Sequence, residues 1–213
     1  MSNISYEISP KDLLLVIDVQ NDFCPNGALG VNEGNEIIDV VNRLGKKFKQ
    51  VVLSQDWHPA DHKSFASNHV GKSPFDLLEM TYGPQVLWPD HCVQGTKGAE
   101  FHIDLDLPNT VMIVRKGYRS EIDSYSAFFE NDHMTATGLD GFLKDNGISR
   151  VFLVGLATDF CVSFSAIDAA KLGYDVVVVD DACRAIDMDG SLNSAYEAMT
   201  KSGVKRCHSK DIT

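Results

Sequence analysis

The sequence predicts a doubly wound α/β domain with a mainly parallel sheet and helices on both faces. Five short apolar runs are continuous rather than alternating, as expected of strands that are buried on both faces. Helical patterns lie between or after most of these runs, which is typical of right-handed crossovers between parallel strands. The runs are residues 13–17, 51–53, 111–114, 151–154 and 176–179.

Four other stretches predict the helices of this fold. In the first, four apolar residues recur at the spacing that places side chains on one helical stripe. A glycine follows closely behind each of the other three, where a residue that tolerates positive φ commonly ends a helix. The stretches are residues 36–44 (with Ile37, Val40, Val41 and Leu44), 139–146, 160–172 and 192–201.

Two irregular segments, around residues 55–110 and 117–135, interrupt the alternation. The first carries both tryptophans and five of the seven histidines, and the second is rich in Tyr, Ser and Phe. Long insertions of this kind in compact α/β domains are more often functional than idle. Since there is no repeat and no linker, we expect residues 1–213 to form a single domain with both insertions at its active site.

The composition excludes several functional classes. Hydrophobic residues at 44% and charged residues at 23% exclude wholesale disorder. The formal net charge of −11 argues against nucleic acid and anionic membrane partners. No apolar run approaches the ~18 residues of a membrane helix, and the start, MSNISYEISPKD, lacks the pattern of a signal peptide. Five scattered cysteines suit a reducing compartment, so we expect a cytoplasmic protein.

Cys161 is the candidate nucleophile. It lies where the fourth strand leads into a helix, with Thr158 or Asp159 suited to the N-cap. Backbone N–H groups and the helix dipole would lower the pKa of its thiol there. Cys183 and Cys207 have no such context and are better explained as inert buried thiols.

Asp18 and Lys116 follow the first and third strands, at the same edge of the sheet as Cys161. A carboxylate there could take the thiol proton and pass it to a leaving amine, while a lysine would stabilise the thiolate. A plain ion pair that closes two strand ends explains the two residues equally well. The absence of G-x-S-x-G and G-x-G-x-x-G motifs disfavours serine hydrolases and dinucleotide-binding enzymes.

Asp56 and His58 form a compact pattern for binding a metal ion. One residue separates them in an extended segment, so both side chains point to the same side. His62 and His91 are candidates for a third ligand, and such a set suits Zn²⁺ or Fe²⁺. Several aromatic residues could line an apolar slot for a flat ligand nearby. These are Phe23, Trp57, Trp88, Tyr125 and Phe128.

Five short motifs occur between residues 18 and 162. They are DVQNDF at 18–23, QDWHP at 55–59, WPDHCV at 88–93, Lys116-Gly117 and GLATDFCV at 155–162. In this order they resemble the nicotinamidase/pyrazinamidase family of isochorismatase-like cysteine hydrolases. The resemblance implies a parallel sheet of about six strands. It also implies hydrolysis of nicotinamide, and of pyrazinamide, to the acid and ammonia, in NAD salvage.

The resemblance assigns catalytic roles residue by residue. Asp18, Lys116 and Cys161 match the family's catalytic Asp, Lys and Cys. The family also has a non-proline cis peptide before the position of Ala157. Backbone N–H groups of Ala157 and Cys161 would form an oxyanion hole.

Binding roles follow from the same resemblance. Phe23 and Trp88 match residues that flank the pyridine ring, and Tyr125 lies in a segment that approaches it. One divalent metal ion is implied, with Zn²⁺ as the first expectation and Fe²⁺ or Mn²⁺ as alternatives. Its ligands would be Asp56, His58 and His91, while His62 aligns with a histidine that is a ligand in only some members.

Other functions stay open. A related cysteine hydrolase could act on another amide or on a carbamoyl group, although relatives of that kind need no metal. Isochorismatase-type hydrolysis of a vinyl ether is weaker, because Cys161 would be superfluous. A metal-bound water could attack instead, leaving Cys161 structural, and a binding module without catalysis is disfavoured because every catalytic position is filled. The sequence leaves the oligomeric state undecided, so a homo-oligomer is one alternative.

Overall fold

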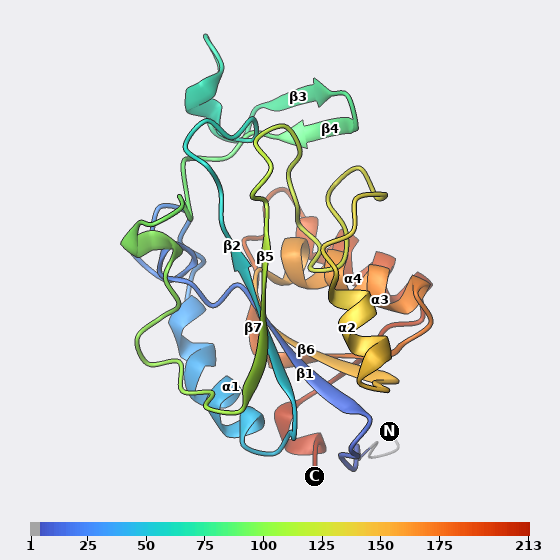
Figure 1. Ribbon diagram of the computed structural model, residues 1–213. Coiled ribbons are helices and arrows are strands. Elements are labelled where there is room, and N and C mark those ends of the chain that lie inside the picture. Colours follow the sequence, from blue (N-terminus) through green and yellow to red (C-terminus); the bar gives the residue numbers. More distant parts are fainter. Residues whose placement is uncertain (1–4) are drawn as a thin grey trace.

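A six-stranded parallel sheet forms the centre of the computed structural model, which describes residues 5–213 (Figure 1). The strand order is β5-β2-β1-β6-β7-β8, and every pairing within the sheet is parallel. The strands are β1 (Asp12–Ile17), β2 (Val51–Asp56), β5 (Thr110–Lys116), β6 (Arg150–Leu156), β7 (Asp175–Arg184) and β8 (Lys205–Cys207). The predicted fold class is therefore confirmed. The first four residues of the segment considered for a signal peptide lie outside the described residues.

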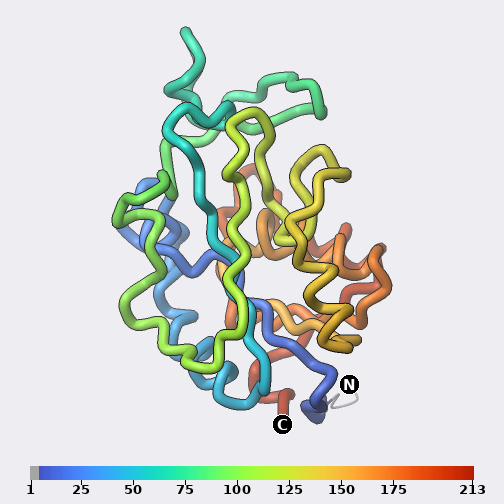
Figure 2. Tube along the Cα trace, in the orientation of Figure 1, coloured from blue at the N-terminus to red at the C-terminus, as the bar shows by residue number. Residues whose placement is uncertain are grey.

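Helices cover both faces of this sheet, as Figures 1 and 2 show. The side chains of β1 alternate between two cores, one shared with α1 and one shared with α2, α3 and α4. Every residue of β1 is buried, which explains why residues 13–17 are continuously apolar. The helices are α1 (Ile38–Gly45), α2 (Leu139–Asp145), α3 (Ser163–Lys171) and α4 (Ser191–Lys201). Among the described residues, no helix has both the length and the apolar character needed to cross a membrane.

A small antiparallel hairpin lies beyond the main sheet, at the top of Figure 1. It pairs β3 (Leu77–Met80) with β4 (Gly83–Val86) within the first irregular segment. Gln85 in this hairpin donates a hydrogen bond of 2.8 Å to Asp123 in the second irregular segment. The two insertions therefore meet, and together they form a cap near the carboxyl ends of the strands.

Two expectations about individual elements are wrong. The third apolar run is not buried on both faces, because β5 is an edge strand where Val111 and Ile113 are about half exposed. The predicted helix over residues 160–172 begins only at Ser163. Thr158–Val162 forms a π-helical turn in which the Val162 N–H donates to the Ala157 carbonyl, five residues earlier. Neither Thr158 nor Asp159 caps α3.

Candidate active site

The strand order brings three predicted catalytic residues to one edge of the sheet. β1 lies between β2 and β6, and the chain adds β2 and β5 on one side of β1 but β6, β7 and β8 on the other. In open α/β sheets, ligands bind beyond the carboxyl ends of the strands at the point where the strand order reverses in this way. Asp18 directly follows β1, Lys116 ends β5 and Cys161 lies in the π-helical turn after β6. Asp18 takes a left-handed conformation with φ of 46°, which turns the chain sharply at the end of the strand.

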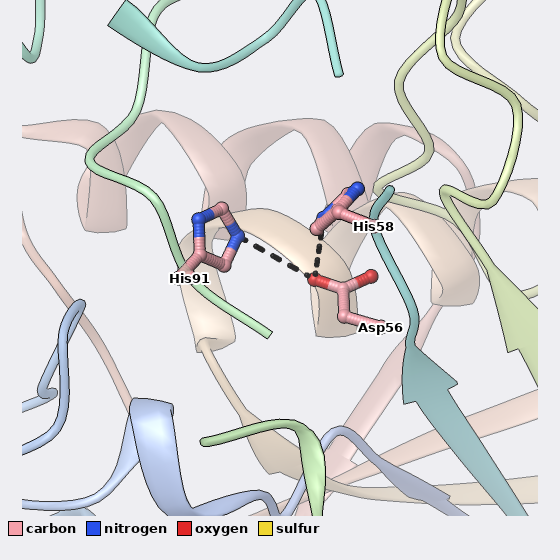
Figure 3. A group of neighbouring side chains, drawn as sticks. All are labelled: Asp56, His58 and His91. Carbon is pink, nitrogen blue, oxygen red and sulfur yellow. Dashed lines mark ion pairs between the residues drawn. The ribbon is translucent and has the colours of Figure 1, made fainter. Parts of the chain in front are cut away.

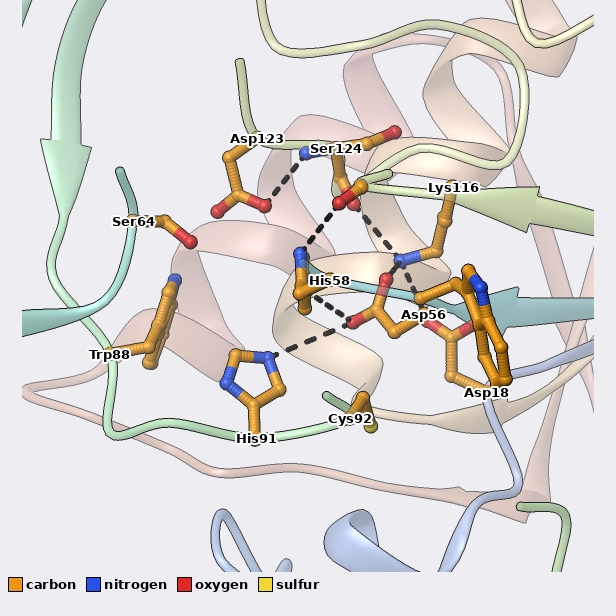
Figure 4. Close-up of polar contacts among 12 residues, drawn as sticks. Asp18, Asp56, His58, Ser64, Trp88, His91, Cys92, Lys116, Asp123 and Ser124 are labelled. Atoms are coloured by element: carbon orange, nitrogen blue, oxygen red, sulfur yellow. Dashed lines mark hydrogen bonds and ion pairs between the residues drawn. The ribbon is translucent and has the colours of Figure 1, made fainter. Parts of the chain in front are cut away.

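Lys116 is the centre of the resulting cluster (Figure 4). Its ammonium nitrogen lies 2.8 Å from Asp18 Oδ2 and 2.5 Å from Asp56 Oδ1. It also donates to the Ser124 carbonyl at 3.0 Å and lies 3.4 Å from Cys161 Sγ. Lys116 and Asp18 are completely buried, so these contacts act in a medium that screens charge weakly.

The electrostatics of the cluster keep the thiol neutral. Burial raises the pKa of the Cys161 thiol, and this effect together with nearby Asp18 outweighs the opposite effect of Lys116. The expectation that a helix terminus lowers this pKa is therefore wrong, because the thiol is buried beside two carboxylates. Burial likewise raises the pKa of the Asp18 carboxyl, despite the ammonium group beside it. Asp18 is consequently a better proton acceptor than an ordinary aspartate.

The two carboxylate oxygens of Asp18 differ in their hydrogen bonds. Ser54 donates a hydrogen bond of 2.6 Å to Asp18 Oδ1. Asp18 Oδ2 faces Lys116 as an ion pair but accepts no hydrogen bond within the described residues. Donor atoms of Asp18, Asp56 and Cys161 all lie within 4.8 Å of one another, so a proton could pass between the thiol and Asp18.

The three predicted metal ligands lie together beside this cluster (Figure 3). Asp56 Oδ2 is 3.5 Å from His58 Nε2 and 3.8 Å from His91 Nε2. His58 donates through Nδ1 to the Gly117 carbonyl, and His91 Nδ1 pairs with the Pro89 carbonyl, so both rings direct Nε2 toward Asp56. One carboxylate and two imidazoles with converging donor atoms suit a divalent metal ion.

Gly117 is required for the position of His58. Its φ of 65° belongs to the left-handed region, and a Cβ there would lie 2.3 Å from His58 Cε1. Any larger residue would therefore displace the imidazole ring. This explains in physical terms why a glycine follows Lys116.

His62 lies next to His58, with 4.5 Å between the ring centroids. Both of its ring nitrogens are already engaged: Nδ1 accepts from the Ser64 N–H, and Nε2 lies 3.3 Å from the Ile122 carbonyl. Burial lowers the pKa of His62 to about 4. The ring is therefore neutral at physiological pH, and it also belongs to a second cluster with His58 and Asp123.

A small cavity opens onto Cys161, Asp56 and His91. The predicted residues Phe23, Trp88 and Tyr125 all line it, and Trp88 Nε1 donates to the Tyr125 hydroxyl at 3.1 Å. Ala157 also lines the cavity and follows a cis peptide bond, as the resemblance implied. The remaining lining residues are Leu29, Asp123, Phe160 and Ile186.

Two aromatic residues expected in the slot lie elsewhere. Phe128 is buried in the apolar core shared with α2, α3 and α4, and Trp57 packs against the core shared with α1, with the Arg115 guanidinium over its ring. Of the lining residues that were not predicted, Phe160 stands beside Cys161 in a recognised motif and could have been found. Leu29 and Ile186 are isolated apolar residues in loops, and nothing local in the sequence marks them.

Comparisons with known proteins identify the family of the chain. The family model described as the isochorismatase domain matches residues 12–211. The chain belongs to the isochorismatase family. The nicotinamidase of Acinetobacter baylyi is 56% identical over 199 residues, which is 93% of each chain. The nicotinamidase of Escherichia coli is 44% identical, covering 91% of this chain and 92% of that relative.

Solved structures show the same relationship. The nicotinamidase/pyrazinamidase of Acinetobacter baumanii superimposes with a TM-score of 0.94 at 53% identity, covering 95% of this chain and 98% of the other. PnC1 from L. infantum, in complex with nicotinate, has a TM-score of 0.86 at 36% identity, covering 98% of each. The pyrazinamidase of Pyrococcus horikoshii, in complex with zinc, has a TM-score of 0.77 at 36% identity, covering 93% and 99%. Within the isochorismatase family, the chain is therefore a member of the nicotinamidase/pyrazinamidase group and an amidohydrolase.

Proposed function

We propose that this enzyme hydrolyses nicotinamide, and also pyrazinamide, to the corresponding acid and ammonia through a thioester on Cys161. One observation carries the proposal: the Cys161 thiol lines a small aromatic cavity and lies against a buried lysine and carboxylate, beside three converging metal ligands of which Asp56 and His91 also line the cavity. The similarity to nicotinamidases over most of the chain supports the same substrate. The product, nicotinate, is suited to NAD salvage, in the cytoplasmic location that the sequence predicts.

Binding would begin with a flat ring between aromatic walls. Phe23 and Trp88 line the cavity and are suited to the faces of a pyridine ring, and Tyr125 closes the side beneath the cap. Asp56, His58 and His91 would hold a divalent metal, which we propose to be Zn²⁺ because the related P. horikoshii enzyme binds zinc. When bound, this ion would act as a Lewis acid that anchors the pyridine nitrogen and orients the ring.

The first half-reaction would start from a neutral thiol. Asp18 takes the proton of the Cys161 thiol, and the sulfur attacks the carboxamide carbon while the carbonyl π electrons move to oxygen. Lys116, 3.4 Å from the sulfur, stabilises the negative charge that develops there. The C–N bond then breaks, and the amide nitrogen leaves as ammonia with the proton from Asp18.

The second half-reaction returns the enzyme to its initial state. Asp18 takes a proton from water as the water oxygen attacks the thioester carbon. The C–S bond breaks, nicotinic acid forms, and Asp18 returns the proton to Cys161. The N–H groups of Ala157 and Cys161 would hold the oxyanion in both steps, and one such donor is worth about 10²–10³ in rate in a serine protease.

Ammonia release from nicotinamide by the zinc-loaded enzyme tests the proposal. Cys161→Ala should lower the rate by about 10⁴-fold or more, as for other nucleophile deletions. Cys183→Ala is the matched control because this buried thiol lies on β7 and does not line the cavity. Activity that survives in Cys161→Ala would move the reaction to a metal-bound water. An inactive but zinc-loaded wild type would exclude nicotinamide as the substrate.

A further inference from the structure

A second, larger pocket lies outside the catalytic cavity, and the two share a wall. The residues that line the outer pocket are apolar or glycine apart from Asp189, its one charged residue. Leu29 and Ile186 line both spaces, so each has one side toward the reacting centre and one side toward the outside. The other residues of the outer pocket are Ala28, Gly30, Pro74, Phe75, Pro89 and Met188.

Ile186 is held in this wall by a buried carboxylate. Asp159 accepts hydrogen bonds from the backbone N–H groups of Ile186 at 3.0 Å and Asp187 at 2.8 Å. It also accepts a hydrogen bond of 2.5 Å from the Ser191 hydroxyl. Asp159 is 5% exposed and lies two residues before Cys161, so the nucleophile's own turn fixes the loop that carries Ile186. Three donors on one carboxylate leave this loop little freedom.

We propose that Ile186 is the specificity-determining residue that limits the substrate to a single aromatic ring, with Asp159 as the residue that positions it. This inference rests on the proposed hydrolysis of nicotinamide. Phe23, Trp88 and the shared wall line the same small cavity, so a single ring between Phe23 and Trp88 would end against that wall. A fused second ring would need the space that the Ile186 side chain occupies. The outer pocket beyond it is apolar and suited to receive such a ring.

The test compares nicotinamide with two bicyclic amides that keep its ring nitrogen and carboxamide in the same relative positions. These are quinoline-3-carboxamide and isoquinoline-4-carboxamide, whose second rings project in different directions. In Ile186→Ala, the ratio of kcat/KM for a bicyclic amide to that for nicotinamide should rise at least tenfold for one of them. This scale follows from the roughly 10–200-fold discrimination that one methylene group can provide in an apolar pocket. Ile186→Val, which removes one methyl group, should give a smaller increase for the same amide.

Matched variants separate this role from general damage. Ile103→Ala makes the same chemical change at a side chain that is 89% exposed and should leave the ratio unchanged. Asp159→Asn should raise the ratio in the same direction as Ile186→Ala, and Ser191→Ala, which removes one of three donors, should raise it less. A purely structural defect would lower kcat/KM for all three amides together and leave the ratio as it was.

Each outcome is decisive. An unchanged ratio in Ile186→Ala, with nicotinamide still hydrolysed by the wild type, would overturn the inference and leave the proposed function intact. A ratio that rises in Leu29→Ala but not in Ile186→Ala would assign the size limit to the other shared residue. A wild type that releases no ammonia from nicotinamide would overturn the proposed function, and this inference with it.

Discussion

Asp18 and Asp56 both pair with the Lys116 ammonium group, and both are buried at the ends of neighbouring strands. Their pKa values nevertheless shift in opposite directions. Burial outweighs the lysine at Asp18 and raises its pKa. At Asp56 burial is outweighed by Lys116 and His58, so the pKa of this carboxyl lies well below its usual range.

The difference between the two carboxylates indicates different uses. A carboxyl with a raised pKa can accept and return a proton near neutral pH, whereas one with a depressed pKa stays anionic and can hold a cation. The two carboxylates that share Lys116 therefore divide the chemistry into a proton-transfer side at Asp18 and a metal-binding side at Asp56. Substitutions that affect one side, the other or both should separate these roles.

Replacing the shared lysine should have the largest effect, because it breaks both sides together. Lys116→Met leaves two buried carboxylates without their cation, and breaking a buried ion pair costs about 3–5 kcal/mol. We expect a fall of that size in the free energy of unfolding, measured by urea denaturation, and no detectable ammonia release. Lys205→Met, which removes a half-exposed pair with Asp175, is the control and should cost only about 0–1 kcal/mol. A comparable fall in both variants would contradict the central role of Lys116.

Asp18→Asn should affect only the proton-transfer side. The amide cannot take the thiol proton, so kcat should fall by about 10²–10⁴-fold, the usual contribution of a general base. The zinc content of the purified protein, measured by atomic absorption, should stay at the wild-type level. If Asp18→Asn lost its zinc and kept its kcat, Asp18 would belong to the metal-binding side and not to the proton-transfer side.

Asp56→Asn should affect the metal-binding side first. Substitution of a residue that only supports a metal ligand lowers metal affinity by about 10–100-fold. Removing the charge of a direct ligand should therefore lower the zinc affinity by at least about 100-fold. Competition with a chelator measures this affinity, and added zinc should restore part of the activity. Asp90→Asn is the control, because Asp90 is next to His91 but bonds to Ser67. Tight zinc binding in Asp56→Asn would contradict the assignment.

Ser54→Ala should have the smallest effect and tests the proton-transfer side alone. Because Asp18 acts as a base, kcat/KM should fall as the pH drops through its raised pKa, above the ordinary value of about 3.9. The Ser54 hydroxyl favours the ionised carboxylate, so its removal should raise that pKa further. The acid limb of the pH profile of kcat/KM should therefore move to higher pH. If the acid limb stayed in place or moved to lower pH, the titration of Asp18 would not be the cause of that limb.

The sequence predicts most of the sheet and the catalytic cluster because both depend on short local patterns. Apolar runs identify five of the six main strands, and titratable residues that follow them must meet at one edge of a parallel sheet. β8 is missed because its three residues, Lys205 to Cys207, form no apolar run. The β3–β4 hairpin is missed because most of its side chains are partly exposed, so no burial pattern marks it. Whether residues 1–213 form one domain stays a prediction.

Other parts of the site depend on distant contacts that no local pattern carries. The raised pKa of the Cys161 thiol results from burial and from two carboxylates on other strands. Ile186 lines the cavity from a loop whose backbone is bound by Asp159, 27 residues earlier in the chain. The resemblance to the family supplies residue roles, but it does not describe how these loops are held.

The position of β5 has a consequence for how the enzyme should lose activity on heating. This strand pairs on one side only, with β2, yet it carries the lysine that both carboxylates need. Edge strands open at a lower free energy than central ones. Fraying of β5 would withdraw Lys116 while the other five strands stay paired. Thermal inactivation should then precede melting, so an enzyme that still looks folded by circular dichroism could already be inactive and would recover on cooling.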